Sequence, residues 1–360
     1  MKKKTEINHS TVLITGAAGF IGAALVQRLL KECEGTHVIG VDSLNDYYDV
    51  ELKKYRLRLN DLAQAEGRSS YQFIKGNIAD RQFVDQLFKE YRPDIVVNLA
   101  AQAGVRYSID HPDVYIESNI VGFFNMLEAC RHSYDDGRTG VQHLVYASSS
   151  SVYGGNKKVP FSTDDQVDHP VSLYAATKKS NELLAHSYAK LYSIPCTGLR
   201  FFTVYGPAGR PDMFYYSATQ KLTKGEDIQI FNYGNCKRDF TYIDDIVEGT
   251  IRVMGGAPER TTGEDGLPVP PYALYNIGGG QPENLLDYVQ TLQEELVRAG
   301  ILPGSYDFDA HKKLVPMQPG DVPVTFADCR PLEKDFGFTP RIGIRDGLRA
   351  FAEWYKKYYG

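Results

Sequence analysis

The sequence predicts an α/β fold, in which a doubly wound parallel sheet is accompanied by a smaller mixed α/β domain. Three observations across the 360 residues favour this fold. Short apolar runs alternate with segments of helical periodicity, which is typical of strands joined by crossover helices. A glycine-rich turn follows the first of these runs directly. Polar and acidic residues follow later runs, at the edge where such sheets bind ligands.

The glycine-rich turn, Gly16–Gly22, lies between a predicted buried strand, Thr11–Thr15, and an apolar helical segment. Gly16 permits a tight turn, and Gly19 allows the backbone to approach a pyrophosphate. Gly22 lets the helix pack closely on the strand, so that the helix N-terminus faces the anion. This context predicts a dinucleotide site, although the spacing is Gly-x-x-Gly-x-x-Gly, and a plain strand-to-helix turn is the alternative.

The second predicted strand, His37–Asp42, ends in an acid twenty residues after Gly22. A carboxylate at this point can accept hydrogen bonds from both ribose hydroxyls and would repel a 2′-phosphate. Asp42 therefore favours NAD over NADP. The third predicted strand, Tyr71–Ile74, leads into Gly76–Ile78, which we expect near the adenine.

The remaining strands of the sheet are expected over Asp94–Ala101 and Val141–Ala147, with a long helix over Asp113–Arg131 between them. Gln102 follows the first of these strands, and the serines of Ser148–Ser151 follow the second. Because ligands lie beyond the carboxyl ends of parallel strands, both segments should face the dinucleotide site.

A helix predicted over Leu173–Tyr192 carries Tyr174 and Lys178, one turn apart on the same face. A phenol with a pKa of about 10 is a poor base at neutral pH, and an adjacent ammonium group favours the phenolate. A hydroxyl of the serine run, such as Ser149, could share the substrate proton. The pair predicts a tyrosine base; two unrelated side chains on a solvated face are the alternative.

Composition excludes several classes of function. The net charge of −5 and the lack of a basic cluster beyond Lys2–Lys4 argue against nucleic-acid binding. No apolar run approaches the length of a membrane span, and residues 2–10 lack the apolar core of a signal peptide. The five cysteines have neither disulfide nor metal-site spacing, so we expect no metal and a cytoplasmic location.

Shorter elements after residue 206 predict a second domain. We place the nucleotide-binding domain at residues 1–205 and the substrate domain mainly at 206–360, with a segment near 239–257 packing back on the first. Glycine- and proline-rich stretches at 255–271 and 316–323 are expected to be loops. The helices expected in this half are Asp212–Lys224, Phe240–Val253 and Asn284–Ala299. The expected strands are Ile228–Phe231 and Tyr272–Ile277.

Blocks along the chain, from about Val12 to Trp354, resemble the extended short-chain dehydrogenase/reductase family with its Rossmann fold, specifically the nucleotide-sugar 4-epimerases. Within that family they are most similar to the UDP-glucuronate 4-epimerases. The blocks that carry the resemblance are Asp42–Asp49, Asn98–Ser108, Arg200–Pro207, Gly209–Met213 and Pro316–Pro323.

The resemblance implies a firmly held NAD and reversible 4-epimerisation of UDP-glucuronate to UDP-galacturonate through a 4-keto intermediate. It implies that Tyr174 and Ser149 act on the sugar O4, with Lys178 as the partner of the phenol. It also implies a homodimer that pairs the helices 113–131 and 173–192 of each subunit.

Further contacts are implied by position. Those to the cofactor are Gly16, Gly19, Phe20, Ile21, Gly22, Asp42, Asn45, Asn77, Ile78, Leu99, Ala100, Ala101, Gln102, Asn119, Tyr174, Lys178 and Phe202. Those to the UDP-sugar are Arg106, Ser149, Ser150, Ser151, Tyr174, Thr203, Arg210, Ile230, Phe231, Arg238, Gln318 and Asp321. Arg238 is the expected diphosphate ligand, and a surface ion pair with Asp239 is its alternative.

The serine run bears on which reaction follows oxidation. Related dehydratases carry Asp and Glu at the positions of Ser150 and Ser151, and related decarboxylases a Glu at the latter. With no ionisable group at either position, simple oxidation and re-reduction remains. These hydroxyls and Arg210 could instead hold the sugar C6 carboxylate. A 4-epimerase of a neutral UDP-hexose or UDP-N-acetylhexosamine stays open, and a UDP-glucuronate decarboxylase or a non-catalytic NAD-binding protein is less favoured.

Overall fold

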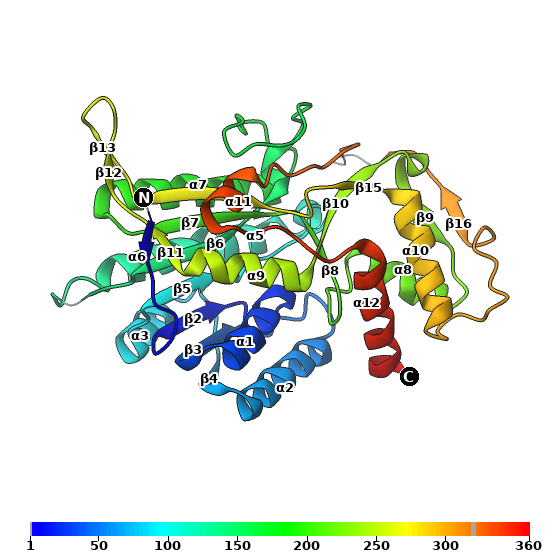
Figure 1. The fold of residues 1–360 in the computed structure, drawn as a ribbon, viewed down its shortest axis with the longest axis horizontal. Coiled ribbons are helices and arrows are strands. Elements are labelled where there is room, and N and C mark those ends of the chain that lie inside the picture. The colour runs from blue at the N-terminus through cyan, green and yellow to red at the C-terminus, as the bar shows by residue number, and fades with distance from the viewer. Residues whose placement is uncertain (1, 138, 318–321) are drawn as a thin grey trace.

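The computed structural model describes residues 2–137, 139–317 and 322–360. Its centre is a parallel sheet of seven strands (Figure 1). In spatial order these strands are β14 (Tyr272–Ile277), β7 (Cys196–Phe201), β6 (His143–Ser149), β5 (Ile95–Asn98), β2 (Thr11–Thr15), β3 (Glu34–Asp42) and β4 (Arg68–Lys75). Every neighbouring pair is parallel, so the predicted doubly wound sheet is confirmed.

Helices cover both faces of the sheet because successive strand side chains point to opposite faces. In β2, Val12 and Ile14 pack into one apolar layer and Leu13 into the other, all three fully buried. Helices that cover the first face are α1 (Phe20–Glu32), α2 (Val50–Glu66) and α9 (Ile243–Met254). Those on the second face are α3 (Arg81–Tyr91), α6 (Gly122–His132) and α7 (Leu173–Tyr192).

The long helix predicted over Asp113–Arg131 is present, but its middle is wound differently. It consists of α5 (Pro112–Tyr115), a π-helical segment (Ile116–Val121) and α6. A π-helical turn is a local departure that hydrophobic periodicity does not reveal. The helix α7 has the predicted bounds, Leu173–Tyr192.

Several predicted boundaries differ from those of the structure, and two of them involve strand pairing. The first three residues of the helix predicted over Phe240–Val253 belong to β10 (Lys237–Tyr242), which pairs with β8 (Thr203–Tyr205) and β15 (Pro282–Asn284). Strand pairing across distant segments outweighs local helical periodicity here. Strand β6 begins at His143 rather than Val141 and continues through Ser149, which pairs with Phe201 of β7.

The later part of the chain contributes to both halves of the molecule. Strand β14 forms one edge of the parallel sheet, and α9 packs against α1. The helices α10 (Leu285–Arg298) and α12 (Ile344–Tyr359) pack together beside the aromatic core around Trp354. The stretch 255–271, expected to be a loop, contains β11 and the pair β12–β13.

The remaining elements are short or peripheral. They are β1 (Lys2–Lys4), α4 (Tyr107–Asp110), α8 (Phe214–Leu222), β9 (Ile228–Ile230), β11 (Gly256–Pro258), β12 (Thr261–Thr262), β13 (Pro268–Val269), α10 (Leu285–Arg298), β16 (Lys312–Leu314), α11 (Arg330–Phe336) and α12 (Ile344–Tyr359). Among the described helices, none has the length and apolar character needed to cross a bilayer.

Candidate active site

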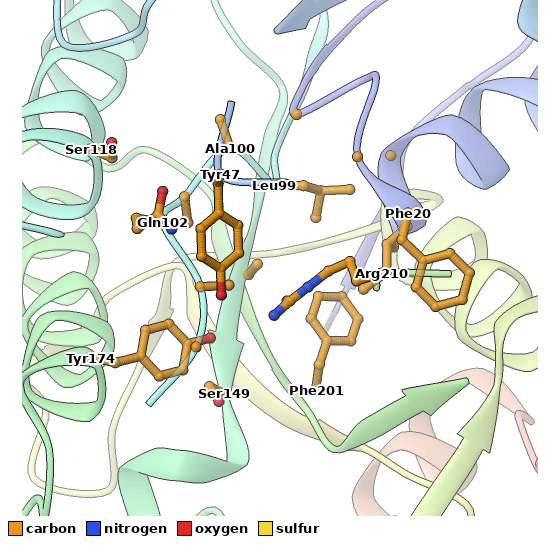
Figure 2. A pocket seen from close by; sticks show the side chains of 18 of the residues that line it. Phe20, Tyr47, Leu99, Ala100, Gln102, Ser118, Ser149, Tyr174, Phe201 and Arg210 are labelled. Carbon is orange, nitrogen blue, oxygen red and sulfur yellow. The ribbon is translucent and has the colours of Figure 1, made fainter. Parts of the chain in front are cut away.

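A cavity of about 440 Å³ opens at the carboxyl ends of the sheet strands. Its walls come from the turn after β2, the ends of β3, β5 and β6, the start of α7 and the segment 201–213. Figure 2 shows side chains from several of these segments converging on it. This is where open parallel sheets bind ligands, and the volume suits a small-molecule site.

The glycine-rich turn lines the cavity, and its geometry requires glycine. Gly16 has φ of +74°, and a Cβ there would lie 2.9 Å from the Ala100 nitrogen. A Cβ on Gly22 would lie 2.1 Å from the Gly16 carbonyl oxygen, closer than any real contact. Because α1 starts directly after Gly19, its free N–H groups face the cavity. This cradle fits a pyrophosphate.

Asp42 stands at the end of β3, as predicted, and lines the cavity. Its carboxylate accepts hydrogen bonds from the Ala18 and Leu44 backbone N–H groups at 3.1 and 2.9 Å. Each carboxylate oxygen keeps capacity for a further donor, which fits ribose hydroxyls. Asn45 also lines the cavity, and its backbone and side-chain oxygens accept from Lys53 at 2.7 and 2.6 Å.

Tyr174 and Ser149 meet in the cavity, with the phenol hydroxyl next to the serine in Figure 2. Burial raises the pKa of Tyr174, while a hydrogen bond with Ser149 and the positive charge of Arg210 act to lower it. Lys178 is buried, and its ammonium donates to the Ala147 carbonyl at 2.9 Å. Burial lowers the pKa of Lys178 to about 8. The positive charge that lowers the pKa of the phenol in this structure comes from Arg210, and the role of Lys178 as its partner stays a prediction.

Arg210 enters the cavity from the side opposite Tyr174 (Figure 2). Its Nε and Nη2 donate to the two carboxylate oxygens of Asp212 at 3.0 and 2.5 Å. The Tyr47 hydroxyl donates to the same carboxylate at 3.4 Å, and burial raises the pKa of Tyr47 to about 12. Asp212 thus occupies one edge of the guanidinium group. Within the described part of the chain no hydrogen bond holds Nη1, so that edge is available to an anionic ligand.

The sequence matches the NAD dependent epimerase/dehydratase family over residues 12–278. The chain belongs to this family. Its NAD dependence confirms the predicted cofactor, and the predicted resemblance is confirmed as well.

Relatives and solved structures agree with this assignment. Protein CapI of Staphylococcus aureus is 47% identical over 354 residues, which cover 97% of this chain and 99% of that protein. A probable UDP-glucuronate 4-epimerase of Rhizobium meliloti (strain 1021) is 41% identical over 355 residues, covering 96% and 97%. The crystal structure of UDP-glucuronic acid 4-epimerase from Bacillus cereus, in complex with UDP-glucuronic acid and NAD, aligns with a TM-score of 0.81 and 31% identity. This alignment covers 97% of this chain and 100% of the other.

Most predicted residues of this epimerase/dehydratase site do line the cavity. Besides those described above, they are Phe20, Ile21, Asn77, Ile78, Leu99, Ala100, Ala101, Gln102, Ser150, Ser151, Phe202 and Thr203. Asn119 lies behind the wall, 1% exposed. Its side chain accepts from the Gln102 N–H at 2.8 Å and donates to the Gln102 carbonyl at 3.0 Å. Asn119 therefore holds the backbone of a lining residue.

Four predicted substrate contacts lie outside the cavity wall. The Arg106 guanidinium lies 4.9 Å from the centre of the Phe231 ring, and Ile230 is fully buried. Arg238 donates to the Pro323 carbonyl at 3.1 Å. Two other predicted contacts, Gln318 and Asp321, fall outside the described residues.

The proposed alternative for Arg238, a surface pair with Asp239, is wrong. Asp239 is fully buried, and its carboxylate accepts from the backbone N–H groups of Gly279, Gly280 and Ala327. Burial raises the pKa of Asp239 to about 6. This carboxylate joins strand β10 to two neighbouring loops and does not serve an exposed ion pair.

Several lining residues were not predicted, among them Tyr47, Tyr48 and Lys53. The two tyrosines lie inside a block that carried the family resemblance, Asp42–Asp49, which was the available signal. Lys53 lies in the first turn of α2, a helix that sequence analysis did not identify. Only the fold brings its side chain behind Asn45.

Proposed function

We propose that this protein interconverts UDP-glucuronate and UDP-galacturonate by 4-epimerisation. The observation that carries the proposal is the meeting of Tyr174, Ser149 and Arg210 in one cavity beside the glycine-rich turn. A base, its hydroxyl partner and a cation for an acidic sugar thus share one site. The names of the Rhizobium meliloti relative and of the Bacillus cereus structure support the same substrate.

Tyr174 accepts the O4 proton of the sugar, and Ser149 shares that proton through its hydrogen bond to the phenol. Arg210 favours the phenolate by its charge. NAD, bound along the glycine-rich turn, supplies the hydride acceptor and donor that inversion at C4 requires. The sugar must turn between the two hydride transfers, so the nucleotide serves as its anchor.

The C6 carboxylate would lie against Ser150, Ser151 and the free edge of Arg210. Hydrogen bonds from these groups fix its orientation. This matters because a 4-keto sugar acid is a β-keto acid, which loses carbon dioxide when its carboxyl bond aligns with the carbonyl π system. Neither serine supplies the acid or base that elimination of water would need, which disfavours a dehydratase.

The competing proposal is a 4-epimerase of a neutral UDP-hexose or UDP-N-acetylhexosamine. Its case is that Asp212 already balances the charge of Arg210. An acidic sugar would then meet a neutral ion pair rather than a free cation. The Nη1 edge and the two serine hydroxyls favour the acidic sugar, because neutral hydroxymethyl groups need no such cluster of donors.

The test is a substrate panel on purified protein. UDP-glucuronate, UDP-glucose and UDP-N-acetylglucosamine are incubated separately, and the sugar nucleotides are separated by chromatography. We expect UDP-galacturonate from the first and at least tenfold slower turnover of the others, the loss of roughly one charge-assisted contact. Faster turnover of a neutral sugar would overturn the substrate assignment, and a UDP-pentose product would indicate decarboxylation instead.

The assembly we propose is a homodimer, in the reducing environment of the cytoplasm where the five free cysteines stay unpaired. A shallow apolar hollow lies between α7 and the π-helical segment, with Ile116 45% and Leu183 61% exposed. A second copy of this face is a self-complementary cover for it. Sedimentation should give twice the chain mass of 40.3 kDa. Leu183→Glu should yield monomers, whereas Leu62→Glu, at an exposed site on α2, should not.

A further inference from the structure

Arg56, in the middle of α2, is 1% exposed and joins three segments around the cavity. Its Nη1 donates to the Ala18 carbonyl in the glycine-rich turn at 3.1 Å and to the Tyr48 hydroxyl at 2.7 Å. Its Nε donates to the Ala208 carbonyl at 2.8 Å, and its Nη2 to the Gly209 carbonyl at 2.8 Å. One guanidinium group therefore connects the dinucleotide side of the cavity to the segment that precedes Arg210.

The charge of Arg56 has no acidic partner in the described part of the chain. All four oxygens that it contacts are neutral, and no Asp or Glu oxygen lies within 4 Å. Arg200 shows the ordinary arrangement, because it is equally buried and makes a bidentate pair with Glu182 at 2.8 Å. A buried cation normally has such a partner. Arg56 does not line the cavity itself, but a pyrophosphate along the adjacent glycine-rich turn would place an anion on the other side of the Ala18 segment that Arg56 contacts.

The segment before Arg210 needs an external support. Ala208 has φ of +52°, a left-handed conformation that is unfavourable for a residue with a Cβ. Gly206 has φ of +144°, and a Cβ on Gly209 would lie 1.7 Å from the Tyr215 hydroxyl. Arg56 holds the carbonyls of two consecutive residues in this turn. The direction in which the chain enters Arg210 thus depends on Arg56.

We infer that Arg56 is a positioning residue with two separable effects. Its charge stabilises the bound dinucleotide through the glycine-rich turn, and its fork of donors orients the segment that carries Arg210. The effect on the segment that carries Arg210 rests on the proposed function, because it is measured as the KM for the sugar nucleotide. The effect on the dinucleotide does not, because it is measured as NAD content.

The test compares Arg56→Met and Arg56→Lys with Arg58→Met, the same change at an exposed residue of α2. The NAD content of each purified protein, the KM for UDP-glucuronate, kcat and the melting temperature are measured. Arg56→Met should retain several-fold less NAD and raise KM about tenfold, the loss of about one charge-assisted contact. Arg56→Lys should restore NAD content but not KM, because an ammonium group cannot reach acceptors on both sides. Arg58→Met should match the wild type.

A folded Arg56→Met protein with wild-type NAD content and KM, and only a lower melting temperature, would show a purely structural residue. If Arg56→Met does not fold, the KM of Arg56→Lys decides: a raised KM supports the inference, and a wild-type KM overturns it. Failure of both variants to fold also overturns the inference. If the wild type does not convert UDP-glucuronate, the proposed function fails by itself. The NAD contents of the three variants then still decide the role of Arg56 towards the dinucleotide.

Discussion

The two sides of the cavity are built in different ways. On the strand side, Ser149 ends β6 and is paired with Phe201 of β7, while Tyr174 lies in the first turn of α7. On the loop side, Arg210 follows a turn with two positive φ values and no strand pairing. Hydrogen bonds from the sheet hold the first side, and individual side chains hold the second.

This difference indicates what holds the site residues in position on each side of the cavity. Base and hydroxyl belong to elements that fold cooperatively, so removing a functional atom should leave their positions intact. Arg210, the proposed ligand of the carboxylate, depends on partners far along the chain, so changes there should shift substrate binding and selectivity. The following predictions test that contrast.

The largest effect is expected at Tyr174. Tyr174→Phe removes the hydroxyl and leaves the ring, which packs edge-on against Tyr115 with centroids 6.1 Å apart. Turnover should fall about 10²–10⁴-fold, the usual loss for one general base. NAD content and melting temperature should stay at wild-type values. Tyr188→Phe, which removes a hydroxyl from the same helix outside the cavity, is the control, measured with the same sugar-nucleotide assay.

Near-normal turnover by Tyr174→Phe would reject the tyrosine as base. A loss of turnover accompanied by loss of NAD would contradict the proposed difference between the two sides. It would mean that the strand side lacks the rigidity that its pairing implies.

A smaller and more selective effect is expected on the loop side. Arg210→Ala should lower kcat/KM for UDP-glucuronate relative to a neutral UDP-hexose by about 10- to 100-fold, since charge-assisted hydrogen bonds contribute about 1.5–3 kcal/mol. Arg210→Lys keeps the charge but loses the paired contact with Asp212 and should fall between. Both ratios come from initial rates with the two substrates.

Equal losses on acidic and neutral sugars would assign Arg210 to the diphosphate rather than the carboxylate. Release of a 4-keto-pentose nucleotide by Arg210→Ala would support the carboxylate role, because a loosely held β-keto acid can adopt the decarboxylating geometry.

The same contrast explains what the sequence could predict. The strand–turn–helix pattern at Gly16–Gly22 and the pair Tyr174 and Lys178 are local, and periodicity alone places the two side chains on one helix face. The hydrogen bonds from Lys178 to Ala147 and from Arg56 to its three backbone carbonyls join segments 31 to 153 residues apart. No local pattern encodes such pairs.

Boundaries failed for the same reason. The residues Phe240–Tyr242 fit a helix by periodicity, yet they pair with Thr203–Tyr205 in a strand. The pairing partner lies about forty residues earlier, and only the folded chain brings it near. The cavity residue Lys53 was missed because its helix α2 was not identified.

A moderate effect on cofactor selectivity is expected at Asp42, which lies on the strand side of the cavity. Asp42→Ala removes a carboxylate that holds the Ala18 and Leu44 N–H groups and faces the ribose site. Discrimination between NAD and NADP should weaken about tenfold, the loss of roughly one charge-assisted contact. The ratio is measured as the nucleotide retained after incubation with both. Asp46→Ala, in the same segment but outside the cavity lining, is the control. Unchanged discrimination by Asp42→Ala would remove the ribose role.

The smallest effect on catalysis is expected at the opposite end of the sheet, away from the cavity. A substitution there serves as a comparison for those on the strand side and the loop side. His143 begins β6, six residues before Ser149, and is fully buried. Its ring nitrogens contact the Met254 carbonyl at 3.2 Å and the Thr197 hydroxyl at 2.8 Å. Burial lowers the pKa of His143 to about 4.

The sign of the pH effect follows from this lowered pKa. The unfolded chain binds a proton below a pKa of about 6.5, whereas the folded protein takes it up only near 4. The stabilisation is therefore complete above about pH 6.5 and is lost as the pH falls towards 4.

Between pH 7 and pH 5 the free energy of unfolding should fall about 2 kcal/mol more in the wild type than in His143→Gln. Urea titrations at both pH values measure it, with the exposed His169→Gln as control. Identical pH slopes in wild type and His143→Gln would contradict the buried neutral imidazole, and turnover at pH 7 should be unaffected, because the cavity lies at the other end of the strand.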